Sequence, residues 1–169
     1  MSLLSRTKAR MGAKIKEYQD AATSYDPGPV GTVIEVEIGE TKEWETPNGG
    51  VCVSCDLRVV APQINKGRKI KLRMNIMNAN ETSEKIGVQD LTNVSIACGF
   101  EDMVDSMEQL HRKRLRAEVL KVEEREGEKV TFYDEKLGYF RPAEGRREDD
   151  APRGYYPEER APTPTRGVE

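Results

Sequence analysis

The stretch KIKLRMNI, residues 69–76, decides the fold that this sequence predicts. Its apolar and polar residues alternate with a period of two, the pattern of a β-strand with one buried face. The apolar positions are Ile70, Leu72, Met74 and Ile76, and the polar positions between them are Lys69, Lys71, Arg73 and Asn75. The strand is therefore predicted to separate a hydrophobic core from a cationic surface.

Two further alternating segments precede this strand. Apolar and acidic residues alternate over 34–38, and a longer alternation with valines, Cys55 and Leu57 runs over 51–59. The turn signals Pro47–Gly50 and Pro62–Gly67 separate the three segments, since glycine, proline and asparagine favour tight turns. Together they predict a three-stranded meander.

The segment after the meander changes to helical spacing. A helix is expected over 81–100, capped by Asn80 or Thr82 and ended by Gly99, and a second short helix over 102–110. Alternation returns over 114–123 and 129–133. Five antiparallel strands with a helical insert between the third and the fourth predict a mainly β fold, an OB-like barrel.

The two ends differ from this central part. A basic amphipathic helix is predicted over Leu3–Ala22, ended by the prolines of Asp26–Pro29. After Pro142 the chain is rich in proline, arginine and glutamate without an apolar period, which predicts disorder. The expected organisation is an N-terminal helix and linker over 1–29, the OB-like domain over 30–142, and a disordered tail over 143–169.

Composition limits the functional classes. The 169 residues carry a net charge of −3, so a polyanion would have to bind a local basic patch. There is no apolar run of about 20 residues and no signal-peptide core, which predicts a cytoplasmic protein that does not enter a membrane, in a bacterial host if a phage encodes it. The three cysteines are an odd number, which disfavours a disulfide framework.

The run from Gly67 to Asn78 also resembles a known family. Its basic turn Lys66–Lys69, its asparagines Asn75, Asn78 and Asn80, and the helix end Ile96–Phe100 are similar to the third-strand region of a bacteriophage family formerly of unknown function. Members are regarded as single-stranded-DNA-binding-like, OB-fold proteins, usually encoded near replication and recombination genes. The resemblance covers roughly 30–142 and implies the same fold and role here.

The predicted nucleic-acid site combines cations for phosphates with flat side chains for bases. Lys69, Lys71 and Arg73 would project from one face about 7 Å apart, close to one nucleotide step. Trp44 is expected in the loop between the first two strands, where it either stacks on a base or anchors the loop. The complete predicted set is Lys42, Trp44, Arg58, Lys66, Arg68, Lys69, Lys71, Arg73, Asn75 and Tyr133.

Other interpretations of these residues stay open. The cationic face could be an ordinary solvated sheet surface, and the cluster His111–Arg114 could be a solvated loop instead of an extension of the phosphate track. A zinc site of Cys52, Cys55, Cys98 and His111 is disfavoured, because an i, i+3 pair on a strand points to opposite faces.

The sequence therefore predicts a sequence-nonspecific single-stranded-DNA-binding protein of phage-type replication or recombination. No catalytic constellation and no cofactor motif is visible, which favours binding over catalysis. The expected partners are single-stranded DNA or RNA, further copies of the chain, and replication or recombination proteins recruited by the tail. The alternative is an OB-like protein-interaction module that assembles with itself or with such enzymes without significant DNA binding.

Overall fold

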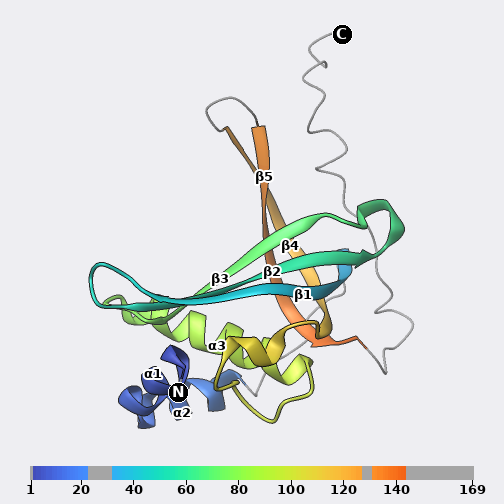
Figure 1. Ribbon diagram of the computed structural model, residues 1–169. Helices are drawn as coiled ribbons and strands as arrows, with labels where there is room; N and C mark the ends of the chain where they lie inside the picture. Colours follow the sequence, from blue (N-terminus) through green and yellow to red (C-terminus); the bar gives the residue numbers. More distant parts are fainter. Residues whose placement is uncertain (1, 23–31, 127–130, 144–169) are drawn as a thin grey trace.

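The computed structural model describes residues 2–22, 32–126 and 131–143 (Figure 1). The predicted turn Asp26–Pro29 and residues 144–169 of the predicted tail lie outside the described residues. The elements in chain order are α1 (Leu3–Met11), α2 (Ala13–Ala22), β1 (Thr32–Glu45), β2 (Val51–Ala61), η1 (Gln63–Asn65), β3 (Lys69–Met77), α3 (Glu81–Ala97), η2 (Met107–Leu110), β4 (Arg114–Glu126) and β5 (Thr131–Pro142).

The strands form one antiparallel sheet in the order β3-β2-β1-β4-β5. The predicted OB-like barrel is wrong, because β3 and β5 are the opposite edges of this sheet and do not pair with each other in the described residues. The sheet is an open, strongly twisted half-barrel in which the β4–β5 hairpin crosses the direction of the other strands (Figure 1).

The described helices form a layer on one face of the sheet (Figure 1): α1 and α2 precede β1, and α3 lies between β3 and β4. The predicted single helix over Leu3–Ala22 is also wrong: Gly12 has a φ of 56°, in the left-handed region that favours glycine, and separates α1 from α2. The predicted short helix over 102–110 contracts to the 3-10 turn η2.

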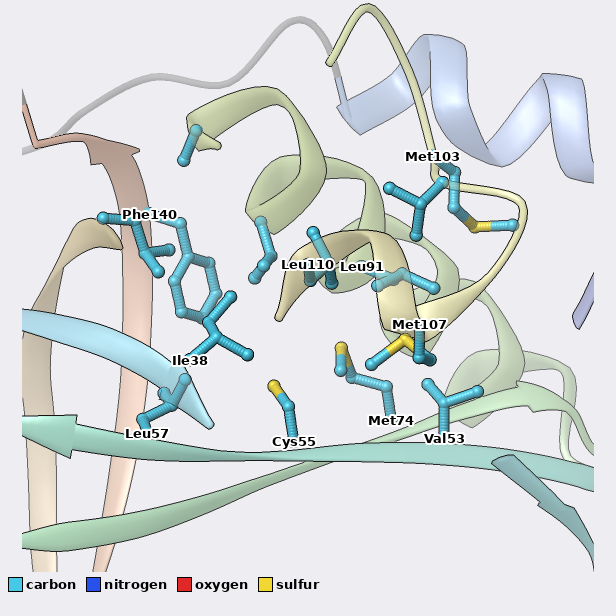
Figure 2. Close-up of a cluster of buried hydrophobic side chains, with 14 of the residues drawn as sticks. Ile38, Val53, Cys55, Leu57, Met74, Leu91, Met103, Met107, Leu110 and Phe140 are labelled. Atoms are coloured by element: carbon cyan, nitrogen blue, oxygen red, sulfur yellow. The ribbon is translucent and has the colours of Figure 1, made fainter. Parts of the chain in front are cut away.

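The core lies between the helical layer and the inner face of the sheet. Figure 2 shows side chains of β2 and β3, such as Val53 and Met74, meeting Leu91 of α3 and Leu110 of η2. Phe140 also enters this core and is only 5% exposed. The last strand therefore extends to Pro142, well beyond the predicted end at Tyr133.

Helix α3 approaches the backbone of β3 closely. A Cβ atom on Gly87 would overlap the carbonyl oxygen of Asn75 and lie 2.7 Å from its carbonyl carbon. The glycine that interrupts the helical pattern is therefore the contact at which the helix packs on the sheet. The Asn80 side chain accepts a hydrogen bond from the Ser83 amide at the start of α3, as a helix N-cap does.

A buried carboxylate joins α2 to α3. Glu84 of α3 lies 2.8 Å from the Lys14 ammonium and accepts a hydrogen bond of 3.2 Å from the Tyr18 hydroxyl. Its second oxygen accepts a bond from the Asn78 amide at the end of β3. Three polar partners compensate for burying this charge, since an isolated buried carboxylate would be costly.

None of the helices in the described ranges is long and apolar enough to cross a bilayer.

Candidate nucleic-acid interface

The outer face of β2 and β3 carries the predicted cations. Their pairing places Arg58 opposite Lys69, Asp56 opposite Lys71, and Ser54 opposite Arg73. The intervening residues of both strands point into the core, so the alternation predicted for β3 is confirmed. Lys69, Lys71 and Arg73 are all exposed and form one row along the edge strand.

Trp44 joins this row from β1. It lies within the strand and not in the β1–β2 loop, which corrects the predicted position. A bulge between Ile38 and Thr41 inserts one extra residue into β1 and reverses the faces of the residues that follow it. As a result Trp44 pairs with Cys52 on the outer face, and the Arg73 guanidinium lies 5.5 Å from the centre of its ring.

Cys52 and Asn75 complete the Trp44 end of the face. The two residues are paired across β2 and β3, and the Cys52 thiol donates a hydrogen bond of 3.1 Å to Asn75 Oδ1. Arg73 Nη2 approaches the same sulfur at 4.0 Å. Cys52 is buried beneath its neighbours, whereas Trp44 and Asn75 are half-buried and Arg73 is exposed. Lys42 follows along β1 and is also exposed.

Carboxylates partly compensate the cations nearer the middle of the sheet. The Lys71 ammonium lies 3.8 Å from Asp56, and Glu37 lies 3.1 Å from Arg58 and 3.3 Å from Arg114. The cations of these pairs are exposed and the carboxylates are half-buried, so each pair contributes little to stability and leaves the cations accessible to phosphates.

The far end of the face opens into a polar cleft of about 490 Å³. Arg58, Lys69, His111 and Arg112 line it together with Glu37, Glu40 and Asp56. His111 Nδ1 donates to the carbonyl of Gly39 at 2.8 Å, which fixes the start of β4 beside the β1 bulge. The cationic row thus runs from Trp44 to this cleft.

The comparison with known protein families covers most of this chain. The model of a family described as a protein of unknown function, DUF669, matches residues 29–153. The chain belongs to the DUF669 family. No curated protein matches it. The family description states no activity and no ligand, so any function of this DUF669 protein has to be argued from its own surface.

The structure brings some predicted site residues of the DUF669 protein together and separates others. Lys42, Trp44, Arg73 and Asn75 form one end of the outer face, and Lys69 lies at the other. Lys66 and Arg68 lie in the turn beyond this end, where Lys66 is exposed and Arg68 half-buried. Tyr133 belongs to β5, where its backbone pairs with Glu124, and its side chain lies outside the described part of the chain.

Cys52 and Cys55 of the DUF669 protein do not converge on one site. Cys52 faces outward and Cys55 faces the core, as expected for i, i+3 positions on a strand. Burial raises the pKa of the Cys55 and Cys98 thiols to about 12, which disfavours the thiolate form that binds zinc.

Cys52 was absent from the predicted set, and Arg112 was considered only as part of the cluster His111–Arg114. Cys52 orients Asn75, which only the register of β2 and β3 reveals. Arg112 lines the cleft in a left-handed conformation with a φ of 70°, and its amide donates to the Ile38 carbonyl at 2.8 Å. The sequence signal for the β1 bulge was Gly39, a glycine inside an otherwise alternating strand.

Proposed function

We propose that this protein binds single-stranded DNA without sequence specificity along the outer face of β1, β2 and β3, in phage-type replication or recombination. The observation that carries the proposal is the Arg73 guanidinium over the Trp44 ring, on the same exposed face as Lys69 and Lys71. A single strand needs cations for its phosphates and flat side chains for its bases, and this face offers both.

The dimensions of the face support this proposal. Successive outward residues of a strand are about 7 Å apart, so Lys69, Lys71 and Arg73 match the phosphate spacing of an extended strand. The resemblance of the Gly67–Asn78 run to phage single-strand binders favours the same ligand and supports the setting in phage DNA metabolism. The outer face binds and performs no chemistry in this proposal.

Titration with poly-dT at two salt concentrations tests the proposal. Trp44 is the single tryptophan, so its fluorescence reports directly on the face. We expect quenching on binding, and weaker binding at the higher salt concentration because cations displaced from the DNA return to it. Unchanged fluorescence together with no change in electrophoretic mobility of the oligonucleotide would contradict the proposal.

A charge reversal locates the binding face. The double variant Lys71→Glu, Arg73→Glu should lose measurable affinity while its melting temperature stays nearly unchanged, since both side chains are exposed. The matched control is Lys16→Glu, Lys85→Glu, which changes the charge equally at exposed positions of α2 and α3. Equal losses in the two double variants would show that net charge matters and the outer face does not.

A further inference from the structure

A second cleft adjoins the one at the end of the cationic row. It has a volume of about 550 Å³, and its walls come from the C-terminal end of α3, the start of β4 and the end of β5. Arg112 lines both clefts. Glu37 of the first cleft also pairs with Arg114 of the second at 3.3 Å, so the two clefts are contiguous.

The second cleft has the excess of positive charge. Its lining contains three exposed cations, Arg112, Lys113 and Arg114. The one carboxylate in this lining is Glu35, which lies 3.6 Å from the buried Arg116 guanidinium. The first cleft, by contrast, is lined by equal numbers of carboxylates and of lysine and arginine side chains. A phosphate is therefore attracted more strongly to the second cleft.

The backbone fixes these cations at the start of β4. The Arg112 amide donates to the Ile38 carbonyl, and the Ile38 amide donates to the Lys113 carbonyl, both at 2.8 Å. These bonds hold Arg112 at a φ of 70°, a conformation that few residues other than glycine adopt. The Lys113 ammonium lies 5.6 Å from the centre of the Phe100 ring. Cations that are already positioned lose less conformational entropy when they bind a phosphate.

The two cationic surfaces lie on different sides of the molecule. The row is on the outer face of the sheet, whereas the second cleft is lined in part by the end of α3, which belongs to the helical layer. A strand that follows both has to turn around the end of the sheet at Arg112. A flexible single strand can make this turn, but a duplex, with a persistence length of about 50 nm, is too stiff to follow it.

We propose that bound single-stranded DNA continues past the row and turns at Arg112 into the second cleft, where Lys113 and Arg114 bind two further phosphates. This inference rests on the proposed function, because it extends the path of a strand that already occupies the outer face. It makes the binding site longer than the row, and it favours a single strand over a duplex.

Titration of the full chain with a short and a long strand tests this path. The oligonucleotide dT4 carries one phosphate for each of Lys69, Lys71 and Arg73, whereas dT12 is long enough to reach the second cleft as well. Quenching of Trp44 fluorescence reports strands on the row in both cases. We expect the salt dependence of affinity to be steeper for dT12 than for dT4, because more phosphates are bound.

The double variant Lys113→Gln, Arg114→Gln removes two cations from the second cleft only. Glu37 keeps its pair with Arg58, at 3.1 Å, so the first cleft is left intact. The magnitude of the slope of log K against log salt concentration should fall by about 1.4 for dT12 and stay unchanged for dT4. A duplex of dT12 with dA12 should bind the variant and the unmodified protein equally, because it does not follow the turn.

The matched control is Lys16→Gln, Lys85→Gln, which removes the same charge from α2 and α3. Lys85 lies about 18 Å along α3 from Ala97 at the second cleft, at the helical rise per residue. Both slopes should therefore remain those of the unmodified protein.

The outcomes distinguish this inference from the proposed function. An unchanged dT12 slope in the Lys113→Gln, Arg114→Gln variant, or an equal fall for dT4, dT12 and the duplex, overturns the path into the second cleft and leaves binding on the row intact. Failure of the unmodified protein to bind either strand overturns both proposals. If the double variant does not fold, Lys113→Gln alone decides the result, since it should lower the dT12 slope by about 0.7.

Discussion

At the scale of single residues, Asp90 provides a measure of burial inside α3. Burial raises the pKa of its carboxyl group to about 6, from 3.8 for an ordinary aspartate. Because the folded state holds its proton more tightly than the unfolded state, this group destabilises the fold increasingly as the pH rises from about 4 to about 6. Above pH 6 the full cost of ionising a half-buried carboxylate is present.

Replacing Asp90 by asparagine should therefore stabilise the protein at neutral pH. We expect a gain on the order of 2 kcal/mol at pH 7.5 and no gain at pH 4, where the aspartate is protonated when folded. Thermal unfolding followed by circular dichroism at both values measures the difference. Asp102→Asn, at an exposed position, is the control and should show no such dependence; an equal gain at pH 4 and pH 7.5 would contradict the interpretation.

At the scale of elements, the contact of α3 with β3 depends on the absence of one side chain. The Gly87→Ala variant should gain helix propensity of about 1 kcal/mol but overlap the backbone of Asn75, so α3 has to move away. We expect a net loss of about 1–3 kcal/mol in the free energy of unfolding, as overpacking at a rigid contact causes. Denaturant unfolding measures it.

The same helix offers a control for Gly87. Ile86 is 52% exposed, so Ile86→Ala removes apolar volume from the neighbouring position without affecting the contact with β3. Its free energy of unfolding should change by about 0.5 kcal/mol or less. If the Gly87→Ala variant has the same free energy of unfolding as the unmodified protein, the helix adjusts freely. The close approach to Asn75 would then not be a constraint.

Regular alternation made β3 predictable, and irregularity made β1 unpredictable. Residues 69–75 pair with β2 without a register shift, so the faces of Lys69, Lys71 and Arg73 could be assigned from parity alone. The β1 bulge after Ile38 reverses parity, so extending the early pattern would place Trp44 in the core. Its actual position became visible only once the pairing with Cys52 was known.

The ends of the elements were less predictable for a different reason. The polar residues between Tyr133 and Phe140 mask the strand signal, and β5 continues there because its backbone pairs with β4 and Phe140 reaches the core. The barrel was predicted from the order of the elements, which does not determine whether β3 and β5 meet. Closure depends on twist and on bulges, and neither leaves a distinct composition in the sequence.

At the scale of the whole molecule, the two faces of the open sheet have different roles. The described helices cover one face and build the core, and the other face presents Lys42, Lys69, Lys71 and Arg73 to solvent. The net charge of −3 would repel a polyanion on average, so the proposed binding depends on this local arrangement. An electrostatic contact of this kind should be confined to one face and sensitive to ionic strength.

The salt dependence of affinity should therefore count the phosphates bound by this face. For single strands the slope of log K against log salt concentration is about −0.7 per phosphate, so three cations in contact contribute about −2 to the slope. The double variant Lys69→Gln, Lys71→Gln should reduce the magnitude of the slope by about 1.4. Titrations with poly-dT at several salt concentrations measure this change.

The control Lys16→Gln, Lys85→Gln removes the same charge from the helical layer and should leave the slope unchanged, because those lysines lie outside the proposed contact. A slope that falls equally in both double variants would mean that the phosphates sense the charge of the whole protein, and the row on β3 would then not be the contact.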